Sequence, residues 1–476
     1  MVSISAIFYG IIIVIIYCMS GIGLISSQVA YWIYTIAIIL FSISVIRNEY
    51  IKKGAKGLLS LTSLYVIFQF LIQTGIGNFS ILYEVKDFSA GWDYLCKAML
   101  ISSISCIFFY FGTRSKSIKY WGELLHTKLL SNMDKRKSLN KPVAIVGAII
   151  VIPIYIFALQ IGIIGYSDAN TINTYTSYAN FSSYIVYITN YIPFVILLLW
   201  TDYFVRREKF PRSSLVGCIL VTGIYMLSSF LTGMKADCIC FAIAVFIISF
   251  WANKKIPLLY TVVVIVVAYL AFAYLPNFRE ILRMDSYSGN RLSALLEAFS
   301  MDASSSASST FGDLLSRINL SQAASAVIKY KDEVGLNSSS PTFLNDLLLS
   351  PITCFIPRSL LPGKSMSTYG IWVYQVVYGK STAISSAAYV TVHGFMYLAG
   401  GIVSVAFFSY LISLLLTFYS GFISAGDDNI YSLCIILMIG IKIIFEPATP
   451  IDLITPITRS IIIYLVYSKI LLRSSH

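Results

Sequence analysis

The chain has 476 residues, of which 57% are hydrophobic and only 12% are charged, and its mean hydropathy is +0.79. This composition excludes an ordinary soluble globular protein, and unbroken apolar runs such as 256–275 exclude the alternating strands of a transmembrane β-barrel. The net charge of +12 does not indicate nucleic-acid binding, because the basic residues are concentrated in short segments between apolar runs.

Taken in chain order, runs of roughly 20 mainly apolar residues predict about twelve membrane-spanning helices. We expect these spans at 4–25, 28–46, 58–77, 94–112, 142–161, 183–204, 213–232, 237–252, 256–275, 391–419, 430–447 and 455–472. The first run is long enough to cross a membrane and no small-residue cleavage site follows it, so we expect an uncleaved span.

Basic segments predict the orientation of these spans. They follow the second, fourth, sixth and eighth runs, at 47–56, 114–141, 206–212 and 253–255. Since basic loops stay on the cytoplasmic side, both termini are predicted to be cytoplasmic and the segment 276–390 external. The excess of positive charge is then a topology signal and a contact for anionic membrane lipids.

The predicted fold is all-α, a polytopic helical bundle with one large external loop. Residues 1–275 would form a bundle of about nine spans, 276–390 the loop, and 391–476 about three further spans. In the loop, Leu292, Leu295, Leu296 and Phe299 recur at helical spacing, and a second set recurs between 311 and 330. These patterns predict amphipathic helices, joined by Ser-rich segments at 302–310 and 336–341.

One stretch of the loop, 351–364, is rigid and basic. It places Arg358 and Lys364 among three prolines. The order of Arg317 in an amphipathic helix, a Ser-rich turn and then Phe355-Ile-Pro-Arg-Ser-Leu-Leu-Pro-Gly-Lys364 resembles the large periplasmic loop of the Wzy-type O-antigen and oligosaccharide repeat-unit polymerases. The segments 387–394 and 232–236 also look like that family, although Leu361 stands where a Trp is common.

The resemblance implies a GT-C-like bundle in the bacterial cytoplasmic membrane and a glycosyltransferase that polymerises undecaprenyl-pyrophosphate-linked repeat units on the outer face. Its partners would be the lipid-linked donor and acceptor glycans, membrane lipids, a chain-length regulator and a flippase, and no nucleic acid. No cofactor is implied. A metal site is not expected from the residues either, because three scattered histidines and eight cysteines without a CxxC pair lack ligand spacing.

Basic external residues suit the chemistry of such a reaction. Breaking the bond between sugar and pyrophosphate leaves negative charge on the departing oxygen, and fixed cations stabilise it. We expect Arg358 to act in catalysis and the pyrophosphate to be bound by some of Lys235, Arg279, Arg283, Arg317 and Lys364. The alternatives are lipid-headgroup contacts for Arg279 and Arg283 and local ion pairs for Lys235 and Arg317.

The acceptor hydroxyl needs a base or an orienting group, for which His393 and Asp346 are the candidates. Tyr369, Trp372 and Tyr374 could stack on sugar rings, or anchor the chain at the membrane interface. Within the eleventh predicted span, Lys442 and Glu446 are four residues apart, which favours a structural ion pair over a proton or substrate path.

Two other functions fit the same plan. A lipid-linked oligosaccharide flippase or transporter would more often have two similar halves, and no convincing internal repeat is present. An O-antigen ligase would share the spans and the loop, but its loop is typically richer in histidine.

Overall fold

The computed structural model of the chain describes residues 4–82, 90–130, 138–165, 182–205, 210–253, 257–283, 290–301, 319–336, 340–353, 356, 360–361, 369–379, 390–424, 434, 437–440 and 449–473. Nearly all of these residues that belong to regular structure are helical, which confirms the all-α class. The described strands are two residues each, β1 (Ser138–Leu139) and β2 (Leu472–Arg473), and they pair antiparallel.

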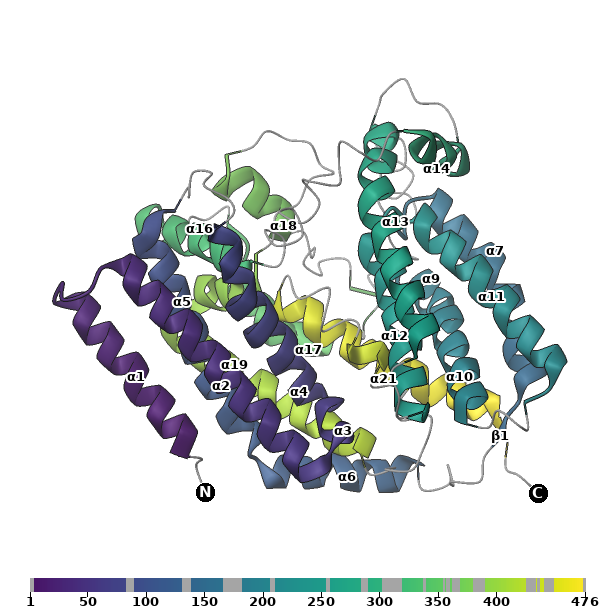
Figure 1. Cartoon of the computed structure of the whole chain (residues 1–476), viewed down its shortest axis with the longest axis horizontal. Coiled ribbons are helices and arrows are strands. Elements are labelled where there is room, and N and C mark those ends of the chain that lie inside the picture. Colours follow the sequence, from purple (N-terminus) through teal and green to yellow (C-terminus); the bar gives the residue numbers. More distant parts are fainter. Residues whose placement is uncertain are drawn as a thin grey trace.

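The helices form two groups that lie side by side (Figure 1). The first contains α1 (Ile4–Gly21), α2 (Ser27–Lys53), α3 (Ala55–Leu58), α4 (Leu61–Tyr65), α5 (Gly91–Thr113), α6 (Lys116–Leu130), α16 (Leu320–Glu333), α17 (Phe343–Thr353), α18 (Tyr369–Trp372) and α19 (Val392–Ser424). Helix α4 continues as the π-helix η1 (Val66–Gly75) and the 3-10 helix η2 (Ile76–Leu82), and α18 continues as the π-helix η4 (Val373–Val377).

The second group contains α7 (Lys141–Gln160), α9 (Ser182–Thr189), α10 (Tyr191–Val205), α11 (Arg212–Leu231), α12 (Lys235–Asn253), α13 (Leu258–Arg283) and α14 (Arg291–Ser300). Helix α21 (Pro450–Leu471) extends from one group to the other (Figure 1). In the first group Tyr419 of α19 meets Thr458 of α21, with 3.4 Å between their hydroxyl oxygens. In the second group the Tyr467 hydroxyl of α21 donates to the Tyr187 carbonyl of α9 at 3.1 Å.

Eight helices among the described residues are long and apolar enough to cross a membrane. They match eight of the predicted spans: Ser27–Lys53, Leu61–Leu82, Gly91–Thr113, Lys141–Gln160, Tyr184–Val205, Arg212–Leu231, Leu258–Leu282 and Val392–Ile423. The predicted spans 4–25, 237–252 and 455–472 fall on shorter apolar helices, Ser5–Gly21, Asp237–Phe250 and Ser460–Leu471. Most of the predicted span 430–447 lies outside the described residues.

The two edges of the molecule differ in what they contain. Both chain ends and α6 lie at the lower edge in Figure 1, whereas α14, α16 and α18 of the expected external loop lie at the upper edge. Helix α17, which belongs to the same expected loop, lies between the two edges beside α19 and α21. Which membrane face each edge meets stays a prediction.

The loop begins later than the sequence suggested. Helix α13 continues through Pro276 to Arg283 instead of ending at residue 275. The reason is packing, because Phe278, Ile281 and Leu282 extend the apolar stripe of α13 and bury it against Leu295 of α14. A proline is tolerated within a long apolar helix when neighbouring groups take over the freed carbonyl.

Candidate functional site

Helix α19 is broken at Gly400 and Gly401, whose φ, ψ angles are −172°, 27° and 69°, −154°. Its two arms fold back on each other, because Met396 Sδ in the first arm lies 3.9 Å from Ser409 Oγ in the second. In a straight α-helix these two positions would be about 20 Å apart. The second arm, 402–424, is long enough to cross a membrane, and we call the first arm, 392–399, which doubles back beside it, the re-entrant arm.

The re-entrant arm runs alongside α5 in the opposite direction. Its Tyr397 ring lies 5.5 Å from the Lys97 ammonium, and its His393 Nδ1 lies 3.4 Å from the Ser102 hydroxyl. Because α5 descends from the upper edge, the step of five positions from Lys97 to Ser102 places His393 about 7 Å below Tyr397 along the bundle. His393 therefore lies inside the helical bundle.

His393 is 2% exposed. Its ring stacks on Phe70 of the π-helix η1, with 5.7 Å between ring centroids and 25° between planes. Its Nε2 has no hydrogen-bond partner among the described residues. A buried polar atom without a partner costs about 1–3 kcal/mol, so it calls for an explanation such as a catalytic role or a bound water.

Strained backbone precedes this histidine. Thr391 is fully buried and has a φ of 64°, in the left-handed region that β-branched residues rarely adopt. Its hydroxyl accepts the Gly394 N–H at 2.9 Å and its carbonyl accepts the Phe395 N–H at 3.0 Å, which starts the re-entrant arm. Strain of this kind costs about 1–3 kcal/mol and is typical of sites whose geometry is held by their surroundings.

A buried polar network docks α16 on the bundle. Asn319 caps the helix by accepting the Ser321 N–H at 3.0 Å, and its amide donates to the Ser80 hydroxyl at 3.0 Å. The Ser321 hydroxyl donates to the Asn78 side chain, which in turn donates to Thr35 Oγ1 at 2.9 Å. This part of the loop is therefore fixed against η2 and α2.

The other end of α16 forms what we call the clamp, made of Lys97, Lys331, Asp332 and Tyr397. Asp332 accepts from Lys97 at 2.6 Å and from the Tyr397 hydroxyl at 2.7 Å. The Lys331 ammonium donates to the Tyr397 carbonyl and, at 3.2 Å, to the Leu398 carbonyl. Burial lowers the pKa of Lys331, against the opposing effect of the neighbouring Asp332 carboxylate.

The clamp is placed where α19 breaks. In a continuous helix the carbonyls of Tyr397 and Leu398 would accept from the amides of Gly401, which is part of the break, and Ile402, which follows it. Lys331 supplies donors to both carbonyls instead. Helix α16 thus holds the upper end of the re-entrant arm.

Asp346 and Tyr369 meet in the structure, since the Tyr369 hydroxyl donates to Asp346 Oδ2 at 2.7 Å. The Tyr369 ring is 3% exposed and packs edge-on against Phe395 at 4.8 Å. No ring face is open to a sugar, so the stacking role expected of Tyr369 does not fit this arrangement. Trp372 packs on Phe343 at 5.2 Å and is half-buried, as is Tyr374.

The turn after α11 collects basic side chains from three helices. Arg279 Nε donates to the Gly233 carbonyl at 2.6 Å, and Arg291 donates to the Leu231 carbonyl at 3.2 Å. The Lys235 ammonium lies over the Phe272 ring at 4.4 Å. Cations are favourable at a helix C-terminus, so Arg279 stabilises this turn in addition to any contact with lipid or pyrophosphate.

The structure does not describe the side chains of several predicted site residues. Arg317, Arg358, Lys364, Lys442 and Glu446 lie outside the described residues, and the side chain of Arg283 does too, although its backbone ends α13. Among the described residues, His393 lies on the same arm as Tyr397 of the clamp, Asp346 contacts Tyr369, and Lys235 and Arg279 lie at one turn. The basic pair Arg358 and Lys364 is outside the described residues, so the structure does not place it relative to these three sets.

Sequence reasoning missed the clamp and one buried ion pair. Lys331 and Asp332 belong to a charged run at the end of an amphipathic helix, and such a run ordinarily indicates a solvated face. The Gly400-Gly401 pair was the one sequence signal that α19 is broken. Asp202 of α10, fully buried, pairs with Lys141 at 3.0 Å. A lone acidic residue near the end of an apolar run was the signal there.

Comparisons of the chain with protein-family models, with curated proteins and with solved structures gave no match. The function must therefore be argued from the site.

Proposed function

We propose that the protein is a membrane glycosyltransferase that polymerises undecaprenyl-pyrophosphate-linked oligosaccharide repeat units at the outer face of the bacterial cytoplasmic membrane. The proposal rests on the sequence resemblance together with one structural observation. That observation is the buried Nε2 of His393, without a partner among the described residues, in an arm whose upper end α16 holds.

In the proposed reaction the hydroxyl oxygen of the acceptor sugar attacks the anomeric carbon of the donor. A new carbon–oxygen bond forms while the bond to the pyrophosphate breaks, and the leaving undecaprenyl pyrophosphate takes the electron pair. His393 Nε2 takes the hydroxyl proton. His393 is preferred to Asp346 as the base, because Asp346 Oδ2 already accepts from Tyr369.

Fixed cations at the upper edge support the proposal by suiting the charge of the leaving group. Lys235 and Arg279 lie at one turn of the second group, on the same edge as α16. Arg358 and Lys364 are assigned to the pyrophosphate from the sequence alone. Preorganised cations of this kind stabilise a departing phosphate without reorganising.

The test is the surface-glycan ladder of cells that lack the gene and carry plasmid-borne variants. Deletion should leave single repeat units on the final acceptor and no long chains, and His393→Gln should fail to restore them at normal protein abundance. His126→Gln, a matched change at the lower edge, should restore them.

Other outcomes would reject the proposal. Loss of all surface glycan, with single lipid-linked units retained inside, would assign the protein to a flippase. Long lipid-linked chains that accumulate without transfer would assign it to a ligase. A normal ladder with His393→Gln would remove His393 from the chemistry.

A further inference from the structure

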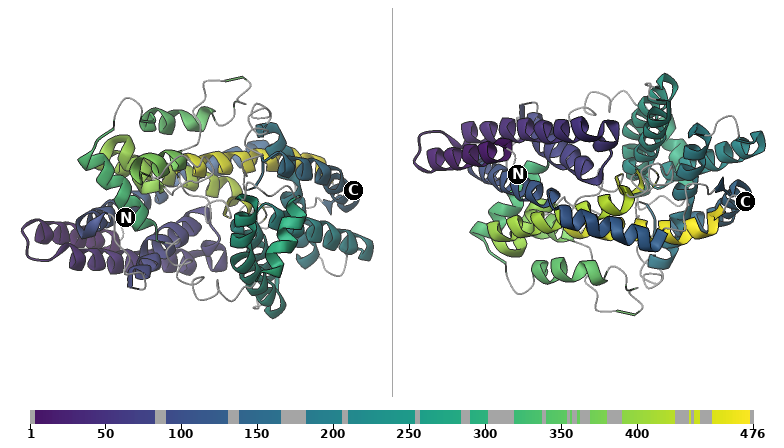
Figure 2. Two further views of the ribbon diagram at one scale, coloured as in Figure 1. Left: turned by 90° about the horizontal axis from the view of Figure 1, so that it is seen from above. Right: turned by 90° about the horizontal axis from the view of Figure 1, so that it is seen from below.

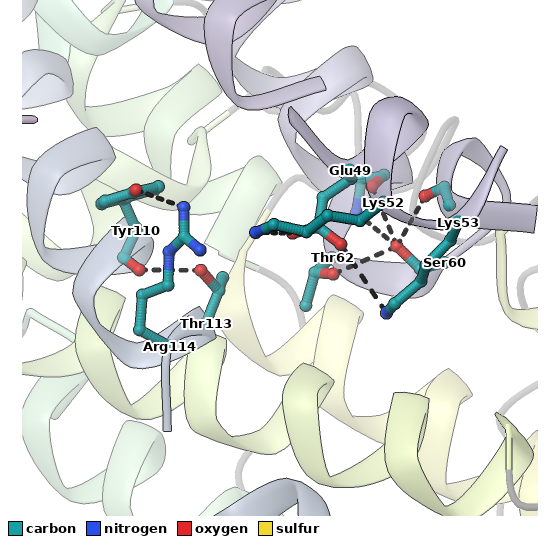
Figure 3. Close-up of polar contacts among 10 residues, drawn as sticks. Glu49, Lys52, Lys53, Ser60, Thr62, Tyr110, Thr113 and Arg114 are labelled. Atoms are coloured by element: carbon teal, nitrogen blue, oxygen red, sulfur yellow. Dashed lines mark hydrogen bonds and ion pairs between the residues drawn. The ribbon is translucent and has the colours of Figure 1, made fainter. Parts of the chain in front are cut away.

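The lower edge of the first group is strongly basic. Among described side chains, the end of α2, the α5–α6 junction and α6 carry seven basic and two acidic residues: Arg47, Lys52, Lys53, Arg114, Lys116, Lys119 and Lys128, with Glu49 and Glu123. Glu49 pairs with Lys52 at 3.7 Å and with Lys53 at 3.6 Å, and the Arg114 guanidinium stacks on Tyr110 at 4.7 Å (Figure 3). The upper-edge helix α16 shows no such excess, with two lysines and two acids at its end.

Helix α6 is fixed rigidly at this edge. It lies across the end of α19, as the view from below in Figure 2 shows. Gly122 approaches so closely that a Cβ there would lie 2.2 Å from the Phe418 carbonyl oxygen, and a Cβ at Gly421 would lie 2.4 Å from the Lys119 carbonyl oxygen. His126 packs against the Phe422 ring at 5.5 Å. One face of α6 is thus occupied by the protein.

The rest of α6 has the composition of a membrane-surface helix. Tyr120, Trp121 and Leu125 are 60%, 59% and 37% exposed, and Lys116 and Lys128 are exposed beside them. Aromatic rings and lysines on a helix that lies across the ends of membrane spans are typical of the lipid headgroup level.

We propose that α6 is a binding site for anionic phospholipid headgroups. Lys116 and Lys128 would contact the headgroup phosphates while Trp121 and Leu125 insert among the upper acyl carbons. The basic excess of this edge makes an anionic lipid the complementary occupant, in preference to a zwitterionic one. This proposal does not depend on the proposed enzymatic function.

The test uses the purified full chain in neutral detergent and phospholipids with brominated acyl chains, which quench nearby tryptophan. The difference between the wild type and Trp121→Phe reports Trp121. We expect brominated phosphatidylglycerol to quench Trp121 at lower concentration than brominated phosphatidylcholine. Each lysine near an anionic lipid contributes about a fivefold preference, so Lys116→Gln with Lys128→Gln should reduce the preference about 30-fold.

Arg212→Gln is the matched control, because Arg212 is an exposed cation at the start of α11, in the other helix group. It should leave the preference unchanged. Equal quenching by the two lipids, or an equal loss with the control, would overturn the proposal. So would a preference that inorganic phosphate removes, which indicates a soluble anion, or a Trp121 that neither lipid quenches, which indicates a protein partner.

Discussion

Removing the Lys331 ammonium should release the upper end of the re-entrant arm. In Lys331→Met the carbonyls of Tyr397 and Leu398 lose their donors, and the break at Gly400 and Gly401 prevents the helix from replacing them. A hydrogen bond to a charged group contributes about 1.5–3 kcal/mol. Because the site is half-buried and water can replace part of the interaction, we expect the opening free energy of the arm to fall by about 2 kcal/mol.

Amide hydrogen exchange of residues 392–402 measures this opening directly. A fall of about 2 kcal/mol corresponds to exchange that is roughly 30-fold faster in this segment. Lys331→Arg, which keeps a charged donor, should remain close to the wild type. Lys329→Met is the control, since it removes an equal charge from the same helix.

Two results would refute the reasoning. Exchange of residues 392–402 that stays within threefold of the wild type would mean that the arm is held by packing alone. An equal acceleration with Lys329→Met would mean that the charge of α16, and not the contact with the two carbonyls, stabilises the arm.

Two further predictions concern the lower edge. Gly122→Ala should destabilise the packing of α6 on α19 by about 1–3 kcal/mol, because the new Cβ would overlap the Phe418 carbonyl, whereas Gly223→Ala, with open space around it, should be tolerated in a thermal-unfolding assay. Burial lowers the pKa of His126, against a hydrogen bond to the Phe422 backbone, so the unfolded chain binds more protons below pH 6.5. Thermal stability should therefore fall as the pH drops from 6.5 toward 5, and His126→Gln should flatten this dependence; an unchanged slope in the variant would contradict the assignment.

Local patterns predicted the spans well. A run of apolar residues needs no distant partner to favour a membrane helix, so Lys141–Gln160 and Leu258–Leu282 matched the runs at 142–161 and 256–275. The helix α14 was likewise predicted by the spacing of Leu292, Leu295 and Phe299.

The candidate site depends on contacts between residues that are far apart in the chain, which local sequence patterns do not predict. The two arms of α19 are both apolar and helical, so their pattern is that of one long span, and the reversal depends on two glycines. Lys331 contacts carbonyls that are 66 and 67 residues further along the chain. Lys141 at the start of α7 pairs with Asp202 near the end of α10, and α9 lies between them in the chain. Charged residues at the end of an amphipathic helix have the same sequence pattern whether they face water or a broken helix.

Helix α21 constrains how the two helix groups could move. Its first half is attached to α17 and α19, its second half to α9 and α10, and the β1–β2 pair fastens the chain beyond it to the segment before α7. A rocking motion of one group against the other would have to bend α21 or slide it along one of these attachments. Helix α21 therefore limits the motion of one helix group relative to the other. A stiffer or a kinked α21 would change the amplitude of this motion without altering any group in the candidate site.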